Sequence, residues 1–115
     1  PNHTFDKNTI KVCKELGINS IIDGYGISPY FEDGVVFFPQ LFYRLYVMPF
    51  GFQVIQIHLN YFTEKDFSKF EQFIKKNQKK IITFSEANHV ISNSFFHKAT
   101  KYFIEKTLKI RRAFL

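Results

Sequence analysis

The chain has 115 residues, of which 45% are hydrophobic and 23% charged, and its net charge at pH 7 is +6. This composition is typical of a globular domain with one modest core, and it excludes an intrinsically disordered chain. The single cysteine excludes an internal disulfide framework, and no run of 18 apolar residues predicts a membrane-spanning helix.

The first predicted elements are a helix and a short strand. Asp6 is a suitable N-cap for a helix over residues 7–16, and Gly17 fits the left-handed position that follows a helix. Residues 18–23 are expected to form a short buried strand that runs into the turn Gly24-Tyr25-Gly26. A helix followed by such a strand is half of a βαβ unit, which favours an α/β fold.

The middle of the chain is predicted to contain three strands. Residues 28–34 form a loop with the turn signal Asp33-Gly34. Residues 35–38 and 41–48 are expected to be strands, or together a hairpin insertion. Residues 52–60 give the clearest pattern, because an aliphatic face alternates with a face that becomes polar toward its carboxyl end. A barrel strand whose inner face opens onto a site has this pattern.

The last part of the chain is predicted to be mostly helical. Thr63 and Asp66 form a capping box for a helix with a buried stripe of Phe67, Phe70, Phe73 and Ile74. Residues 81–84 are expected to be a further short strand, and a long helix runs from Asn93 to about residue 112. Residues 98–112 contain six Lys or Arg residues and one acidic residue, Glu105. This helix is therefore expected to present either a solvated basic face or a surface for an anionic partner.

Four residues are candidates for a site. His58 lies near the carboxyl end of the 52–60 strand, where it is either an acid, base or ligand, or a core histidine bonded to a backbone carbonyl. Asn60 lies beyond it on the same face. Asp23 ends a strand and is either a site carboxylate or a cap of the following turn, and His3 precedes a helix cap.

A metal site made by this chain alone is not predicted. No two histidines have the helical i,i+4 spacing, and neither a CxxC nor an HExxH motif occurs. His89 and His97 lie in polar helical surroundings, and we expect them to be surface or packing residues.

Three segments in this order resemble the polysaccharide deacetylase superfamily, the NodB-homology carbohydrate esterases. The first is Pro1-Asn2-His3-Thr4-Phe5-Asp6. The second is Ile22-Asp23-Gly24-Tyr25-Gly26, followed by Phe38-Pro39-Gln40. The third is Pro49-Phe50-Gly51, leading to Ile57-His58-Leu59-Asn60. The resemblance covers roughly residues 1–82, and residues 83–115 are left as a helical C-terminal extension of the same partial domain.

The resemblance implies a distorted (β/α) barrel and removal of N-acetyl groups from an amino-sugar glycan. In this family a divalent metal, usually zinc, is held by an Asp and two His of the N-terminal half, and a second Asp is the general base. The hydrophobic-x-His motif of the family matches Ile57 and His58 with their neighbours, so the resemblance implies that His58 is the general acid. It also implies that His3, Asp23 and Asn60 bind substrate.

The paired Asp motif and the His-x-x-x-His motif of the family do not occur here. The chain is therefore expected to be the C-terminal part of such an enzyme, with no metal ligand of its own and no activity without the missing N-terminal half. An exposed half-barrel edge favours a homo-oligomer. The alternative is a non-catalytic basic α/β module that binds nucleic acid or a membrane surface through its C-terminal helix. The sequence indicates neither the compartment nor the substrate.

Overall fold

Helix α1 (Lys7–Glu15) forms where the sequence predicts it. In the computed structural model, which describes residues 5–114, the Thr9 amide donates to the Asp6 carboxylate at 2.8 Å, and the Asp6 amide donates back to the Thr9 hydroxyl. These bonds satisfy amides that the first turn of a helix leaves without partners, and they lower the pKa of Asp6. Gly17 ends the helix at φ +72°, a conformation that costs glycine little.

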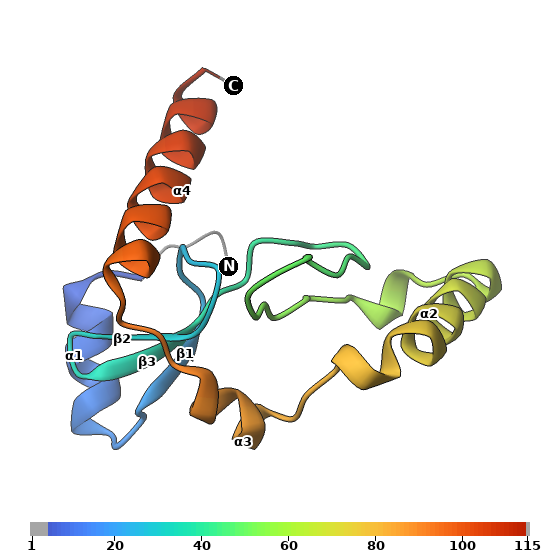
Figure 1. Cartoon of the computed structure of the whole chain (residues 1–115), viewed down its shortest axis with the longest axis horizontal. Coiled ribbons are helices and arrows are strands. Elements are labelled where there is room, and N and C mark those ends of the chain that lie inside the picture. Colours follow the sequence, from blue (N-terminus) through green and yellow to red (C-terminus); the bar gives the residue numbers. More distant parts are fainter. Residues whose placement is uncertain (1–4, 115) are drawn as a thin grey trace.

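Three strands form one small sheet in the order β1-β3-β2 (Figure 1). Strand β1 (Ser20–Ile22) pairs in parallel with β3 (Val35–Phe38), and β2 (Tyr30–Glu32) pairs with β3 antiparallel. The strand predicted at residues 35–38 is confirmed. The strand predicted at residues 18–23 forms only over Ser20–Ile22, and it is not buried as expected, since Ile22 is 52% exposed. The turn predicted at Asp33-Gly34 is confirmed, since both residues have positive φ and make a two-residue hairpin turn. The loop predicted over residues 28–34 is wrong at residues 30–32, which form β2.

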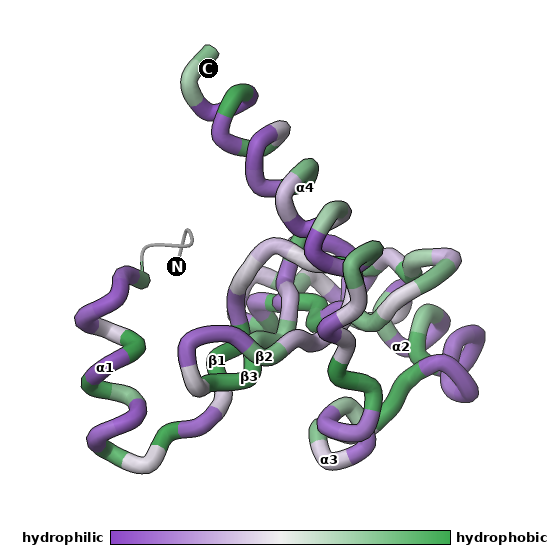
Figure 2. The backbone as a smooth tube through the Cα atoms, turned by 60° about the vertical axis from the view of Figure 1, so that its left-hand side comes forward, coloured by the Kyte–Doolittle hydropathy of each residue, from purple (hydrophilic) through white to green (hydrophobic). Residues whose placement is uncertain are grey.

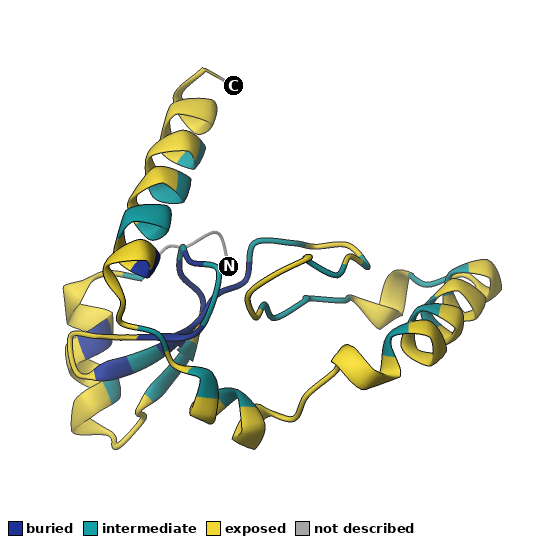
Figure 3. Cartoon of the chain, in the orientation of Figure 1, coloured by how far each residue is buried: buried dark blue, intermediate teal, exposed yellow. Residues whose placement is uncertain are grey.

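The core lies between α1 and this sheet. Val35 and Phe37 of β3, Tyr30 of β2 and Ile10 of α1 are buried and pack together. The Phe37 ring stacks on Tyr30 with centroids 5.2 Å apart. Figure 3 shows buried residues concentrated in and around the strands, whereas the long helices are mostly exposed. Phe38 points to the other face of the sheet, where its ring lies 4.3 Å from that of Phe84.

The strands predicted at residues 41–48 and 52–60 are wrong. Only an isolated parallel bridge between Phe42 and Ile55 forms there, supported by a bond from the Val54 amide to the Pro39 carbonyl at 2.9 Å. Apolar and polar residues do alternate in the sequence along most of residues 54–60, but a strand also needs a continuous backbone partner. Strand β3 ends just before Pro39, so its backbone offers no continuous partner to residues 52–60. Residues Leu59–Tyr61 form a 3₁₀ helix (η1) instead.

The remaining elements are helical. Helix α2 (Glu64–Asn77) begins with the expected capping box between Thr63 and Asp66. Its aromatic stripe was expected to be buried, yet none of its residues is, and Phe67 is 49% exposed. The strand predicted at residues 81–84 is also wrong. A second capping box, between Thr83 and Glu86, starts helix α3 (Phe84–Ala87) instead. Two 3₁₀ helices, η2 (Gln78–Lys80) and η3 (Asn88–Val90), follow α2 and α3.

The expected long C-terminal helix is confirmed as α4 (Phe95–Ala113). Figure 1 shows α4 extending away from the sheet, and α2 lying on the opposite side of the molecule from α1 and the sheet. The radius of gyration, 15.6 Å, exceeds the about 13 Å expected for a compact domain of this length. The fold is therefore mixed α/β, as predicted, but its three strands do not form a barrel. Among residues 5–114, no helix combines the length and apolarity that crossing a bilayer requires.

Candidate functional site

The carboxyl ends of the parallel strands β1 and β3 meet at one edge of the sheet. Ile22 pairs with Phe38, so the chain leaves both strands at the same level, through Asp23 on one side and Pro39 on the other. Gln40 follows and is buried. Polar groups at this edge of a parallel sheet are well placed to form a site.

Asp23 is buried, with 9% of its surface exposed, and its carboxylate accepts a hydrogen bond from the Gly24 amide at 2.6 Å. It therefore caps the turn that follows β1, one of the two roles the sequence allowed. Gly24 has φ +106°, and an added Cβ there would overlap the Tyr30 hydroxyl. Burial of that hydroxyl raises the pKa of Tyr30. The turn is thus fixed by both its backbone and its packing.

Hydrogen bonds hold a third segment, residues 51–56, against this edge. The Gln53 side chain donates to the Gly26 carbonyl at 2.6 Å and accepts from the Leu41 amide at 3.3 Å, so it links the segments that follow β1 and β3. The Phe52 amide donates to the Ile27 carbonyl at 2.6 Å. At Gly51, with φ +77°, an added Cβ would overlap that carbonyl. Glycine is therefore required for this close approach.

A side-chain relay connects the buried edge with His58. The Gln40 amide nitrogen donates to the Gln56 carbonyl oxygen, and the Gln56 amide nitrogen lies 3.1 Å from His58 Nε2. An amide nitrogen is only a donor, so Nε2 must accept. The proton of the neutral imidazole is then on Nδ1. The relay thereby sets both the tautomer and the orientation of an otherwise exposed ring.

The predicted site residues are only partly brought together. His58 joins Gln40 through the relay, and Asp23 lies at the same sheet edge. Asn60, expected on the face of His58, is exposed in the 3₁₀ helix η1, and within residues 5–114 no hydrogen bond links it to the relay. His58 precedes that 3₁₀ helix rather than lying in a strand. His3 is outside the described residues.

Sequence reasoning did not assign roles to Gln40 and Gln56. The available signal was their position, since Gln56 precedes His58 by two residues on one face and Gln40 follows the end of a strand. His97 was expected to be a surface or packing residue, and the structure buries it to 3% exposure. Its ring lies 5.0 Å from that of Tyr30, and neither ring nitrogen has a hydrogen-bond partner in the described part of the chain.

The surroundings of His97 disfavour its charged form. Burial is the main reason that its pKa is lowered, and the positive charge of Lys101 adds to the effect while Glu32 opposes it. His97 is the N3 residue of α4, and its amide donates to the Ser94 hydroxyl that caps the helix. The histidine therefore acts as an apolar ring that packs the start of α4 onto β2.

An apolar cleft of about 690 Å³ opens next to the segment that carries the relay. Residues 46–55 form one side, α2, α3 and the connection between them form another, and Pro29, Phe38 and Pro39 complete the lining. Ile55 and Ile57 line it, whereas Gln56 and His58 alternate with them and form the relay. The cleft offers mainly hydrophobic contact.

Residues 5–114 do not fit a metal centre. Within this range, no three His, Cys, Asp or Glu side chains come together in a group that could hold a metal ion. Comparison of the chain with protein-family models, curated proteins and solved structures gives no match. The resemblance to the deacetylases is thus a resemblance of sequence motifs alone.

Proposed function

We propose that the chain is the C-terminal part of a polysaccharide deacetylase-like hydrolase, which removes N-acetyl groups from an amino-sugar glycan, and that His58 protonates the leaving amine. The observation that carries the proposal is the relay from Gln40 through Gln56 to His58. It supports a role in proton transfer, because it holds the ring of an exposed histidine in one orientation. The acid form would be the imidazolium, which gives one proton to the leaving amine and becomes a neutral ring.

The arrangement of the sheet edge adds support. Asp23, Gln40 and the segment that carries His58 are assembled where ligands gather in parallel sheets. The divalent metal that this function implies would be held by residues that the chain does not contain, since those at the edge do not form a ligand set. The roles assigned here are therefore limited to proton transfer by His58 and support of the site by Asp23 and Gln40.

The exposed apolar surface is consistent with a partner half of the same domain. Large hydrophobic side chains are exposed on α1, α2 and α3 and in the 41–62 region, and an apolar cleft lies beside the relay. Surfaces of this extent normally contact protein. We propose that the missing half covers the cleft and completes the sheet, which would place a substrate against His58.

The test is acetate release by the complete protein from an N-acetylated oligosaccharide. His58→Ala is expected to lower kcat by about 10²–10⁴-fold, the usual contribution of a general acid. His89→Ala is the matched control, because His89 is an exposed histidine outside the relay. Full activity of His58→Ala would overturn the assignment. The coding DNA upstream of Pro1 gives a second test, since it should encode an Asp-Asp pair followed by His-x-x-x-His.

A further inference from the structure

Helix α4 has two different apolar faces. The inner face carries the buried His97, whose ring contacts that of Tyr30, and the half-buried Ile104 and Leu108. Lys101 belongs to the same face. Its ammonium group pairs with Glu32 and lies 4.7 Å from the centroid of the Tyr30 ring. Residues spaced by three and four along a helix form one stripe, so these four residues share one face of α4, which contacts the body through His97 and Lys101.

The outer face of α4 has no comparable partner. At 100° per residue, its large apolar side chains form one stripe nearly opposite to the docking face, and they are Phe95, Phe96, Tyr102, Phe103, Ile110 and, just after the helix, Phe114. Phe95 is 86% exposed and Phe103 is 68% exposed. Figure 2 shows hydrophobic and hydrophilic positions alternating along the whole projecting length of this helix.

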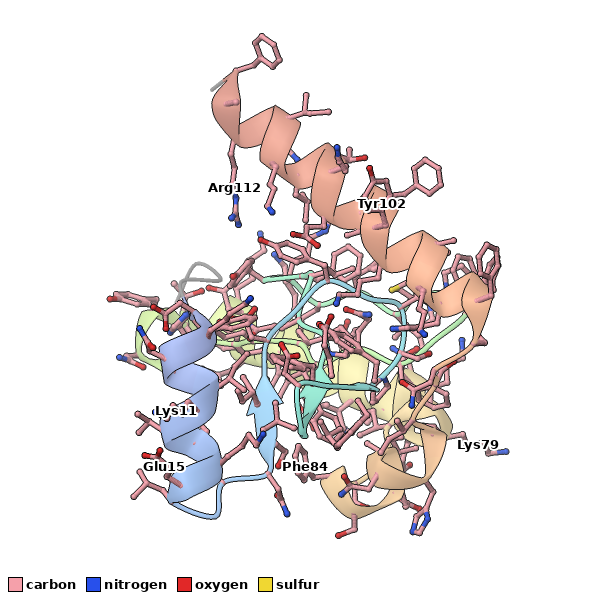
Figure 4. The ribbon with its side chains drawn as sticks, turned by 90° about the vertical axis from the view of Figure 1, so that its left-hand side faces the viewer. Lys11, Glu15, Lys79, Phe84, Tyr102 and Arg112 are labelled. Carbon is pink, nitrogen blue, oxygen red and sulfur yellow. The ribbon has the colours of Figure 1, made fainter. Side chains whose placement is uncertain are left out.

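The charges of α4 are almost all positive. The helix contains six Lys or Arg and a single acidic residue, Glu105. Glu105 pairs with Lys109 at 2.6 Å. Lys106 lies 5.3 Å from the ring centroid of Tyr102, beside the outer stripe. Figure 4 shows α4 rising from the body, with the Arg112 side chain reaching back toward it. On the same helical projection Lys106 falls within the outer stripe, Lys98 and Lys109 lie along one side of it, and the stripe contains no acidic residue.

We propose that α4 binds an anionic lipid surface. The outer stripe would lie in the plane of the membrane interface with its aromatic rings among the lipid headgroups, while the flanking lysines contact lipid phosphates. This use fits a convex apolar ridge flanked by lysines, because an interfacial helix needs both apolar burial and attraction to anionic lipid. The proposal concerns where the protein is held and does not depend on its being a deacetylase.

The binding test uses the complete protein and vesicles of phosphatidylcholine, with or without 30% phosphatidylserine, in a sedimentation assay. We expect binding to the anionic vesicles only, weakening as salt screens the charges. Lys98→Gln combined with Lys106→Gln should lower the partition coefficient by roughly thirtyfold, since each lysine near such a surface contributes about fivefold. The matched control is Lys75→Gln with Lys76→Gln, which removes two lysines from α2 and should change binding little.

The apolar contribution is tested with Phe96→Ser combined with Phe103→Ser. These side chains are exposed, so the variant should keep its circular dichroism spectrum while losing vesicle binding at least tenfold. Binding that is equal with and without phosphatidylserine, or that survives this double change, would overturn the proposal. Binding to a DNA duplex through the same four residues would assign the face to nucleic acid. Self-association abolished by the Phe changes would assign it to a second copy of the chain.

Discussion

Residues 5–42 and residues 43–114 differ in what holds their elements in place. Every buried hydrophobic residue of the described chain lies in the first region, in α1, β2 or β3. The second region contains most of the helical residues, but it buries no hydrophobic side chain to the same degree. Capping boxes occur in both, at Asp6, Thr63 and Thr83. Local signals therefore suffice to start helices, whereas a core requires a complementary surface.

The magnitudes explain this difference. A helix cap contributes about 1 kcal/mol, while full burial of a Phe side chain contributes about 1.5–3 kcal/mol. A helix of 14 residues, the length of α2, is marginal in water without tertiary contacts. The second region is thus expected to be less stable than the first.

The largest expected effect compares one phenylalanine from each region. Phe37→Ala removes a ring that is 1% exposed and stacked on Tyr30, so it should lower the free energy of unfolding by about 3–5 kcal/mol. Phe67→Ala removes a half-exposed ring from α2 and should cost about 1 kcal/mol or less. Urea denaturation measures both. Similar losses for the two variants would show that the regions are equally packed.

The next effect separates two glycines of the first region. Both Gly24 and Gly17 have positive φ, but only at Gly24 would a Cβ meet neighbouring atoms. Gly17→Ala should therefore cost about 1–2 kcal/mol for conformation alone. Gly24→Ala should cost about 1 kcal/mol more, because it also displaces the Tyr30 hydroxyl. Thermal unfolding of the two variants would contradict this if Gly17→Ala were the more destabilised.

The smallest effect concerns the contact between the regions at His97. Its pKa is lowered in the folded protein, so below pH 6.5 the unfolded chain binds more protons than the folded one. The contribution of His97 to the free energy of unfolding is therefore fully present above that pH. It decreases as the pH falls, by at most about 1.4 kcal/mol per pH unit. His97→Phe should reduce this decrease, and His89→Phe serves as the control. An unchanged pH profile of unfolding in His97→Phe would disprove the link.

The sequence predicts the first region better than the second for a physical reason. The Asp6 cap and Gly17 define the two ends of α1. The apolar runs of β1 and β3 form short strands that pair with each other. The turn at Asp33-Gly34 is predicted correctly, but residues 30–32 before it are assigned to the loop, although such a pair makes a hairpin turn when strands flank it. Residues 52–60 and 81–84 have strand composition, but strand formation depends on a partner that sequence pattern does not reveal.

The candidate site was predictable in part. The position of Asp23 at the carboxyl end of β1 followed from the order of elements, and the alternation along residues 54–60 placed Gln56 on the face of His58 without giving it a role. The link to Gln40 could not be predicted, because it joins side chains 16 residues apart through an irregular segment. The burial of His97 depends on how α4 docks against Tyr30, which is a long-range contact.

The turn at Asp33 and Gly34 also bears on the order in which the chain folds. It brings β2 and β3 together with a two-residue connection, and hairpins of this kind form in about 1–10 μs. Strand β1 joins β3 only after a much longer loop has closed, at a greater cost in entropy. The hairpin is therefore expected to form first and to act as the template onto which β1 and then α1 assemble.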